Sequence, residues 1–355
     1  MDELRLPVRP DLDDVTPYVS PQLPARYRMN TNESPFPPPP DLLEAVTERL
    51  GASALNRYPD RDANVLLDAL AEATGWRRDG IWIANGSNEV LLHLFLTFGG
   101  PQRTSLTFEP TYSLHTLIAR IAGNRTLQIP RRSSDFGVDP EALTDAVRET
   151  DIALFCHPNN PTGSLEDRAI IERATREAPL VVVDEAYIEF ASDGSSVADL
   201  LPKHRNLVVV RTFSKAWSLA GVRLGYMLAD PSIVATMAKV RLPYGISTFT
   251  QLVGAVALSR QEEARQRISA IVAERDRLSE GVASLGLRVH PSDANFVLFE
   301  VGDPHRTQQV WDSLMERGVL VRNYASSRHL QGCLRVTAGM PEETDAFLTA
   351  LKEVL

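Results

Sequence analysis

A lysine in an unusual polar setting is the first residue of this sequence that could do chemistry. Lys215 follows the apolar run Leu207–Val210, within the stretch RTFSKAWSLAGVRLGY. Hydroxyl groups at Thr212 and Ser214 flank it, and a second cation, Arg223, follows eight residues later. Burial and a neighbouring cation both lower the pKa of an amine, which makes it a better nucleophile and base. Lys215 is therefore the leading candidate for a catalytic residue.

Polar residues also end two other apolar runs. Asp184 and Tyr187 belong to LVVVDEAY at 180–187, and Asn160 belongs to HPNNPTG at 157–163, which follows the apolar run 152–156. The X-Pro bonds of that turn are candidates for cis geometry. In an open parallel sheet, ligands bind beyond the carboxyl ends of the strands. We therefore expect these polar side chains to meet Lys215 at one edge of a sheet.

A strand-to-helix turn supplies a candidate phosphate site. In ANGSNEV at 84–90, Gly86 and Ser87 come directly before a predicted helix, where free N–H groups and the helix dipole favour an anion. Such turns are common, but this one would stand beside the hydroxyls and the arginine around the lysine. The other candidates suit further groups of one ligand. The amine of Lys215 could condense with an aldehyde, and Asp184 could pair with a ring nitrogen. Asn160 and Tyr187 could hydrogen-bond a phenolic oxygen. Together they specify pyridoxal 5′-phosphate as the ligand.

The elements that must position these residues alternate along the chain. The runs near 152, 180 and 207 are continuously apolar, which is typical of parallel strands covered on both faces. After residue 259 the pattern changes to one long charged helix, Gln261–Leu285, followed by short strands and helices. We predict an α/β protein with an extended, proline-rich N-terminal arm at 1–40, a large cofactor-binding domain at 41–259 and a small C-terminal α+β domain at 260–355.

Composition excludes several classes of function. The net charge of −9 over 355 residues argues against nucleic acid or an anionic membrane as a partner. No apolar stretch approaches a membrane span, and the acidic N-terminus does not read as a signal peptide. Two cysteines, Cys156 and Cys333, exclude a disulfide framework and favour the cytoplasm. The histidines show no metal-binding spacing, so no metal is predicted.

The sequence resembles the fold-type I aminotransferases of class II over nearly its whole length, with the closest likeness to the histidinol-phosphate aminotransferases. The segments that carry the resemblance are NRYPDRDA, NGSNEVLL, PNNPTG, DEAYIEF, SKAWSLAGVRLGY and LQGCLRVTAG. The resemblance implies a large domain with a mostly parallel seven-stranded sheet and a smaller α+β C-terminal domain.

The resemblance also implies a role for each candidate at the cofactor ring. Lys215 would hold pyridoxal 5′-phosphate as a Schiff base and then shuttle the proton. Asp184 would keep the pyridine nitrogen protonated, which makes the ring an electron sink. Asn160 and Tyr187 would contact the hydroxyl oxygen of the ring, and Tyr112 would stack on its face.

At the phosphate, the resemblance implies contacts from Ser87, Asn88, Thr212, Ser214 and Arg223. Related enzymes often carry aspartate where this chain has Asn88, so that contact is left open between side chain and backbone. Tyr58, in NRYPD, would reach the phosphate of the cofactor in a neighbouring subunit, which implies a homodimer with shared active sites.

At the substrate end, Arg335 resembles the family arginine that binds the carboxylate of the amino donor. Histidinol phosphate carries a phosphate instead, so one site must accept either anion, and Arg322 is a plausible second cation. Asn32 and Tyr18 lie on the N-terminal arm and are candidates to fold over the substrate.

The function implied is transamination between L-histidinol phosphate and 2-oxoglutarate, a step of histidine biosynthesis with only small-molecule partners. Three alternatives stay open at this point. The first is an aromatic amino-acid (phenylalanine) aminotransferase, the second a decarboxylase of a phosphorylated amino acid, and the third a non-catalytic module that binds the cofactor.

Overall fold

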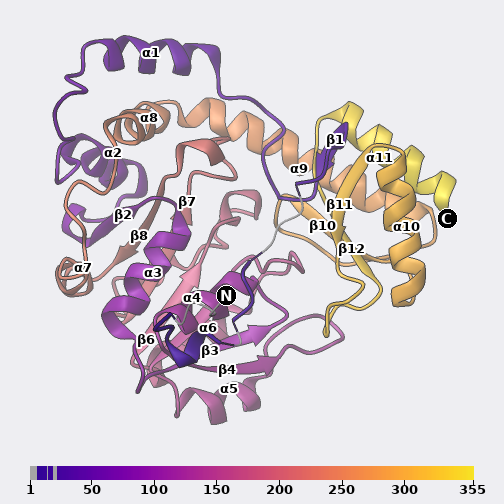
Figure 1. Cartoon of the computed structure of the whole chain (residues 1–355), viewed down its shortest axis with the longest axis horizontal. Helices are drawn as coiled ribbons and strands as arrows, with labels where there is room; N and C mark the ends of the chain where they lie inside the picture. Colours follow the sequence, from indigo (N-terminus) through magenta and orange to yellow (C-terminus); the bar gives the residue numbers. More distant parts are fainter. Residues whose placement is uncertain (1–5, 14, 19–21) are drawn as a thin grey trace, which may run out of the picture.

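The computed structural model describes residues 6–13, 15–18 and 22–355. Two bodies stand side by side in Figure 1: a large domain around a seven-stranded sheet, and a small domain around a five-stranded sheet near the C-terminus. The long helix α9 (Gln261–Ser284) runs from the first body to the second. The large and small domains thus follow the predicted architecture.

The large sheet has the strand order β2-β8-β7-β6-β5-β3-β4. In that order the strands are Ile81–Ala84, Gly225–Ala229, Leu207–Thr212, Leu180–Asp184, Ile152–Cys156, Thr104–Glu109 and Arg125–Pro130. The four pairings from β7 to β4 are parallel. β8 is antiparallel to both of its neighbours, so the sheet is mostly parallel, as predicted. The chain between β7 and β8 forms the lysine turn instead of a crossover helix, and it returns alongside the strand that it left.

Both faces of this sheet are buried, which explains the continuously apolar strands. Val181 and Val183 of β6 pack into one hydrophobic cluster, whereas Val182 packs into another on the opposite face. The first face is covered by α1, α2, α5, α6 and α8 (Pro40–Gly51, Asn64–Thr74, Pro140–Val147, Arg168–Glu177 and Thr248–Leu258). The second is covered by α3, α4 and α7 (Ser87–Phe98, Ser113–Ile121 and Pro231–Met237). Successive side chains of a strand point to opposite faces, so both must be apolar.

The small domain is built on the order β1-β11-β12-β10-β9. These strands are Tyr27–Met29, Val319–Asn323, Cys333–Thr337, Phe296–Glu300 and Arg288–Val289, with α10 (Pro304–Glu316) and α11 (Pro341–Val354) packed beside them. β1 comes from the segment predicted as an extended arm, yet it pairs in parallel with β11. A strand of only three residues is too short to show a periodic pattern.

Two smaller expectations are also met. Cys156 and Cys333 are free and buried. The bonds His157–Pro158 and Asn160–Pro161 are cis, and so is Glu109–Pro110. Within the residues that the structure describes, no helix is both long and apolar enough to cross a membrane.

Candidate active site

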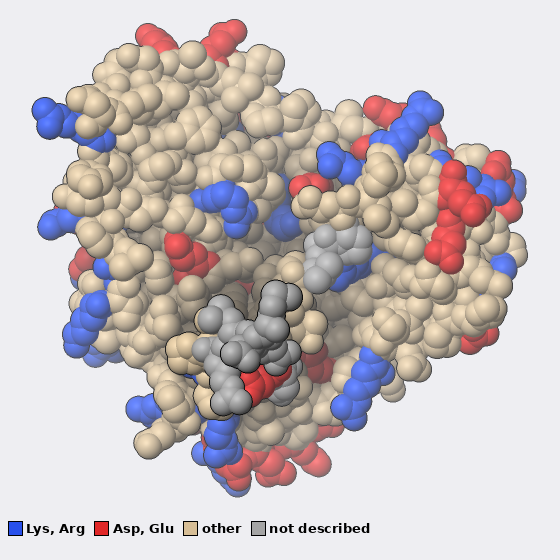
Figure 2. Space-filling view, in the orientation of Figure 1, with Lys and Arg blue, Asp and Glu red and all other residues tan. Residues whose placement is uncertain are grey.

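A cavity of about 670 Å³ lies between the two domains. In Figure 2 this face of the molecule is hollowed between the two bodies, and Lys or Arg side chains line the hollow. The cavity is lined from the large domain by the polar ends of its strands and from the small domain by β11, β12 and the loop between them. Its volume lies in the range of about 300–1,000 Å³ that is usual for cofactor and substrate sites.

Three adjacent parallel strands deliver the central residues to this cavity. β5 leads into the turn that carries Asn160, β6 ends at Asp184, and β7 ends at Thr212 just before the lysine. Because β5, β6 and β7 pair in order and in parallel, their carboxyl ends share one edge. The sheet edge predicted from the sequence is therefore the floor of the cavity.

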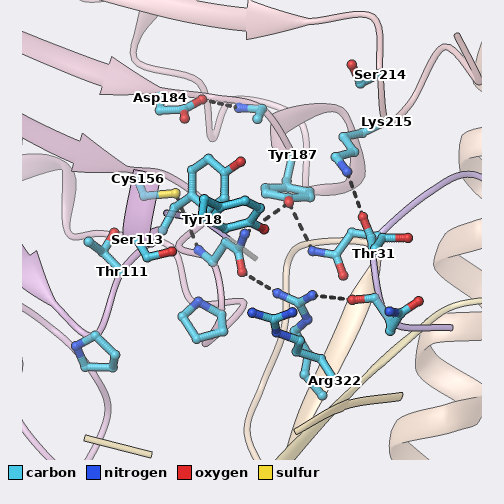
Figure 3. A pocket seen from close by; sticks show the side chains of 18 of the residues that line it. Tyr18, Thr31, Thr111, Ser113, Cys156, Asp184, Tyr187, Ser214, Lys215 and Arg322 are labelled. Carbon is cyan, nitrogen blue, oxygen red and sulfur yellow. Dashed lines mark hydrogen bonds between the residues drawn. The ribbon is translucent and has the colours of Figure 1, made fainter. Parts of the chain in front are cut away.

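Lys215 points into the cavity, and its Nζ donates a hydrogen bond to the backbone oxygen of Thr31 at 3.0 Å (Figure 3). Burial, together with the nearby guanidinium groups of Arg335 and Arg223, lowers the pKa of Lys215 to about 8, although the charge of Glu33 opposes the shift. An amine with a pKa near 8 is partly neutral around neutral pH, so it can act as a nucleophile or a base.

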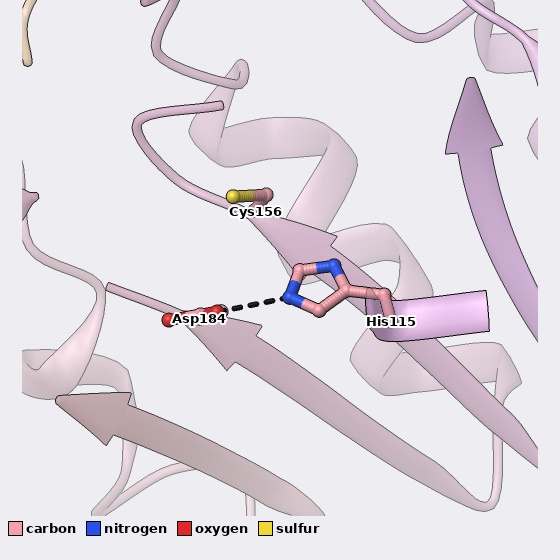
Figure 4. Close-up of side chains that lie close together, drawn as sticks. All are labelled: His115, Cys156 and Asp184. Carbon is pink, nitrogen blue, oxygen red and sulfur yellow. Dashed lines mark hydrogen bonds and ion pairs between the residues drawn. The ribbon is translucent and has the colours of Figure 1, made fainter. Parts of the chain in front are cut away.

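Asp184 accepts two hydrogen bonds at the end of β6. Its Oδ2 lies 2.9 Å from Nε2 of His115, and its Oδ1 accepts from the backbone N–H of Ala186 at 3.1 Å (Figure 4). The exposed fraction of Asp184 is 3% and that of His115 is 0%, so this pair is sealed from water. His115 was not among the residues predicted from the sequence. The one feature of the sequence that could have indicated His115 is its position in α4. It follows Tyr112 by three residues, so it lies one helical turn away from that candidate.

Cys156 completes a cluster in which His115, Cys156 and Asp184 each offer a ligand atom within 4.8 Å of the others (Figure 4). Burial and the Asp184 charge raise the pKa of the Cys156 thiol. A raised pKa disfavours the thiolate, which is the form that binds metal ions. We therefore interpret the cluster as support for Asp184 and not as a metal centre.

The phenol of Tyr187 accepts hydrogen bonds from two amides. The Nδ2 atoms of Asn32 and Asn160 lie 3.0 and 3.3 Å from its hydroxyl oxygen (Figure 3). Burial raises the pKa of Tyr187, so the phenol stays protonated and can donate to a ligand. Asn32, predicted to fold over the substrate, lines the cavity, where its side chain lies against Tyr187 and its Oδ1 accepts from Thr337. This side chain thus helps to hold the tyrosine in place.

A polar corner at the start of α3 has the geometry of a phosphate site. Gly86, with φ of 88°, precedes Ser87, the first residue of the helix. Ser214 lies opposite, where its Oγ is 3.0 Å from that of Thr212 and 3.4 Å from Nη1 of Arg223. A Cβ on Gly225 would lie 2.2 Å from the backbone N of Ser87, so glycine lets the two chain segments touch there. The predicted phosphate residues that line the cavity are Ser87, Asn88, Thr212, Ser214 and Arg223.

Two tyrosines lie at the mouth side of the cavity. The rings of Tyr18 and Tyr112 pack edge to face with centroids 6.5 Å apart. Burial raises the pKa of Tyr112, and a hydrogen bond with Asn88 opposes the shift. Whether Asn88 contacts the phosphate through its side chain or its backbone stays a prediction.

Two arginines face the lysine from the small domain. Arg322 on β11 and Arg335 on β12 are direct partners across an antiparallel pair, so both side chains reach the cavity. Nη1 of Arg335 donates to Asn160 and to Tyr324, and Nη2 donates to the backbone oxygen of Asn30. Its Nε is buried and has no partner among the described residues. An unpartnered guanidinium N–H in a side chain that is 5% exposed is suited to an anionic ligand.

Tyr58 lies outside this cavity. Its exposed fraction is 79%, and its ring stacks on Tyr244 at 4.5 Å between centroids. Among the described residues of one chain its ring stacks on Tyr244 and on no predicted cofactor residue, so its contact with the cofactor of a partner subunit stays a prediction.

The residues present fit pyridoxal 5′-phosphate. The sheet edge offers an amine at one side, a buried carboxylate held by a histidine at another, and a glycine-lined helix start with hydroxyls at a third. These three groups complement the aldehyde, the ring nitrogen and the phosphate of that cofactor.

Known proteins resemble this chain over nearly its full length. The family model for class I and II aminotransferases matches residues 27–351. The chain is 44% identical over 366 residues to the histidinol-phosphate aminotransferase of Frankia casuarinae, a match that covers 99% of this chain and 90% of that protein. It is also 44% identical over 354 residues to the histidinol-phosphate aminotransferase of Thermobifida fusca, covering 98% and 95% of the two chains.

A solved structure shares the arrangement of both domains. The crystal structure of histidinol-phosphate aminotransferase from Sinorhizobium meliloti in complex with pyridoxal-5′-phosphate superposes with a TM-score of 0.90 at 27% identity. That match covers 99% of this chain and 98% of the other.

Proposed function

This chain belongs to the class I and II aminotransferase family, and we propose that it is a histidinol-phosphate aminotransferase that uses pyridoxal 5′-phosphate. It interconverts L-histidinol phosphate and 2-oxoglutarate with imidazole acetol phosphate and L-glutamate, in histidine biosynthesis. The observation that carries this proposal is the 44% identity to enzymes of that name over 99% of the chain.

Bound pyridoxal 5′-phosphate supplies an electron-poor ring that stabilises negative charge on the amino-bearing carbon of the substrate. The residues around it would fix its position. Asp184, oriented by His115, would hold a proton on the ring nitrogen, and Tyr187 and Asn160 would hydrogen-bond the phenolic oxygen. Tyr112 would cover the ring, and the corner at Ser87 would hold the phosphate.

Lys215 is the candidate for proton transfer. Its Nζ would take the proton from the amino-bearing carbon of the amino donor. In the second half of the reaction it would deliver a proton to the keto carbon of the amino acceptor. With a pKa of about 8, it can do both near neutral pH. A positioned general base is typically worth ~10²–10⁴ in rate.

The two substrates differ in their anion, and the two arginines offer one site for both. Glutamate carries a carboxylate where histidinol phosphate carries a phosphate. Arg335 would pair with either through its unpartnered Nε, and Arg322 lies beside it on the adjacent strand. Burial of Arg335 strengthens the attraction, because little water screens it. Tyr18, near the cavity mouth, would cover the substrate.

We also propose a homodimer in the cytoplasm. Large apolar side chains close in sequence to Tyr58 or to its stacking partner Tyr244 are exposed, and they include Leu55, Val65, Leu242 and Phe249. An apolar surface of this kind is unusual on a monomer. A second copy covering it would bring Tyr58 toward the cofactor phosphate of the partner.

A panel of amino donors and phosphate esters, assayed with the purified holoenzyme, tests the proposed reaction. We expect kcat/KM for histidinol phosphate to exceed that for phenylalanine by at least roughly 100-fold, because a phosphate can pair with both Arg335 and Arg322, whereas the single carboxylate of phenylalanine would occupy only one of them. A ratio near one would identify an aromatic aminotransferase instead, and release of carbon dioxide would identify a decarboxylase.

A further inference from the structure

A second cavity, of about 600 Å³, lies behind the turn that carries Lys215. We call it the rear crevice. It is bounded by α9 on one side and by the large domain on the other, where the 3-10 helix η3 (Ile188–Phe190), β7 and β8 contribute side chains. No predicted cofactor or substrate residue lines it.

The rear crevice and the candidate active site share a wall. Along the lysine turn, Ser214 and Lys215 line the active site, whereas Trp217 lines the crevice. In the segment after β6 the same division holds, because Tyr187 lines the active site and Glu189 lines the crevice. One thickness of chain therefore separates the two cavities.

The crevice carries a carboxylate without a partner. Oε2 of Glu189 is buried and accepts no hydrogen bond from the residues that the structure describes. Burial, with a smaller contribution from the neighbouring charge of Glu185, raises the pKa of Glu189 to about 7, although the charge of Arg211 opposes the shift. Two further carboxylates, Asp193 and Asp293, line the same crevice. The Oε2 atom of Glu189 therefore lacks the hydrogen-bond donor that normally offsets the desolvation of a buried oxygen.

The arginines of the crevice are already engaged. Arg211 donates to Glu185 at 2.9 and 3.0 Å, and Arg265 donates to Glu262 at 2.8 Å. Arg275 contacts an aspartate and two backbone oxygens. Since the charges of these arginines are compensated within the chain, the charged groups that the crevice still offers to a ligand are its carboxylates.

The remaining lining is aromatic and apolar. Trp217, Tyr226 and Phe190 contribute rings, and Ile268 and Val272 of α9 contribute aliphatic side chains. Trp217 is only partly buried, and it packs against both the large-domain and the small-domain hydrophobic clusters. Its exposed part faces a space large enough for a ring.

We propose that the rear crevice is a second ligand site, which takes a small organic cation carrying an aromatic ring. The cation pairs with the Glu189 carboxylate, and the ring packs against Trp217 and its aromatic neighbours. The volume suits a molecule of this size. The site does not depend on which amino donor the enzyme uses.

A ligand in the crevice can affect cofactor binding through the shared wall. A ligand in the crevice contacts Trp217, two residues from Lys215, and Glu189, two residues from Tyr187. Any change that it makes in cofactor affinity must be matched by an equal effect of the cofactor on ligand affinity. If the ligand changes the cofactor dissociation constant about twofold, the cofactor therefore changes the ligand dissociation constant about twofold as well.

The probe for this site is benzyltrimethylammonium, a permanent cation with an aromatic ring that cannot condense with the cofactor aldehyde. Isothermal titration of the holoenzyme should give one site per chain with a dissociation constant of about 1 mM or tighter. Glu189→Gln should weaken binding at least about fivefold, because it removes the charge and keeps the shape. Glu280→Gln, an exposed carboxylate on α9 outside the crevice, should leave it unchanged. Benzyl alcohol and benzoate should bind more weakly than the cation.

Ala264→Trp, which fills the crevice from α9, provides a second variant and should abolish binding even if Glu189→Gln fails to fold. Cofactor absorbance and the melting temperature report whether each variant is intact. Absence of binding by the wild-type holoenzyme at 10 mM probe (about tenfold above the expected constant) would overturn the proposal. Equal binding by folded Glu189→Gln or Ala264→Trp would overturn it as well.

Discussion

The Nζ atom of Lys215 lies 3.0 Å from the backbone oxygen of Thr31, although the two residues belong to different domains of the fold. Thr31 follows β1, a strand of the small sheet, whereas the lysine follows β7 of the large sheet. The candidate catalytic amine is thus held by a segment anchored in the opposite domain. Any movement of the small domain relative to the large one changes the environment of this amine.

The lowered pKa of Lys215 should be measurable in the cofactor-free protein. Acetylation of its amine should rise with a midpoint near pH 8, where an ordinary lysine titrates near about 10.4. Competitive labelling with acetic anhydride, followed by mass spectrometry, gives this midpoint. Lys352, exposed on α11, serves as a reference in the same sample. A midpoint for Lys215 above pH 10 would contradict the burial argument.

The same pKa predicts the pH dependence of stability. The fold disfavours the proton on Lys215, so between about pH 8 and 10.4 the unfolded chain binds more protons than the folded one. Stability of the cofactor-free protein should therefore rise with pH in that window, relative to Lys215→Met, by on the order of 1–3 kcal/mol. Urea denaturation at a series of pH values measures this difference.

Replacing His115 should weaken the cofactor site without unfolding the protein. His115→Phe leaves Asp184 with the backbone N–H of Ala186 and without its 2.9 Å imidazole partner. A hydrogen bond to a charged group is worth about 1.5–3 kcal/mol, so cofactor affinity should fall roughly 10- to 100-fold. Equilibrium dialysis with pyridoxal 5′-phosphate measures it. The control is His93→Phe, a half-buried histidine of α3 outside the cavity, which should bind normally.

Gly225 should not tolerate a side chain. In Gly225→Ala the new Cβ would meet backbone atoms of Gly86 and Ser87 at 2.4 and 2.2 Å, and so would displace the turn that holds the phosphate. We expect a loss of about 1–3 kcal/mol in stability and at least about tenfold in cofactor affinity. Gly221→Ala is the matched control, because no atom lies within 4 Å of its added Cβ although this glycine also lines the cavity. If the two variants had the same stability and the same cofactor affinity, the assignment of this corner as the phosphate site would be contradicted.

Mixed dimers test whether Tyr58 acts across subunits. Tyr58→Asp would place a carboxylate at the partner's phosphate, and Lys215→Ala would remove the amine, so each variant alone should be inactive. Mixing equal amounts and allowing subunits to exchange should restore about a quarter of wild-type activity, because half of the dimers then contain one intact site. Activity that stays at the level of the separate variants would show that Tyr58 serves its own chain or none.

The residues at the floor of the cavity could be predicted from the sequence, whereas the groups that hold them in place could not. Asp184, Asn160 and Lys215 stand out because each follows an apolar strand, and parallel strands end at a common edge. His115 was missed because it lies within the regular pattern of helix α4, where a histidine attracts no attention. The Thr31 contact was also missed, since a backbone oxygen leaves no trace in the residue types.

The direction of β8 and the pairing of β1 could not be predicted from the hydrophobic pattern of the sequence, for a different reason. Periodicity reports burial of the two faces of a strand and says nothing of its neighbours or its direction. β8 is as fully buried as the parallel strands beside it, so its apolar run looks the same. The three residues of β1 find their partner only when β11 is present.

The pairing of β1 with β11 also constrains how the protein is made. Tyr27 is translated well before Val319, its partner in the sheet. The strands of the large sheet are all translated before the small domain is complete, so they can fold while β1 waits unpaired. The segment that holds Thr31 beside the lysine is therefore anchored only after β11 has been made, so a nascent chain that lacks β11 does not present a finished site.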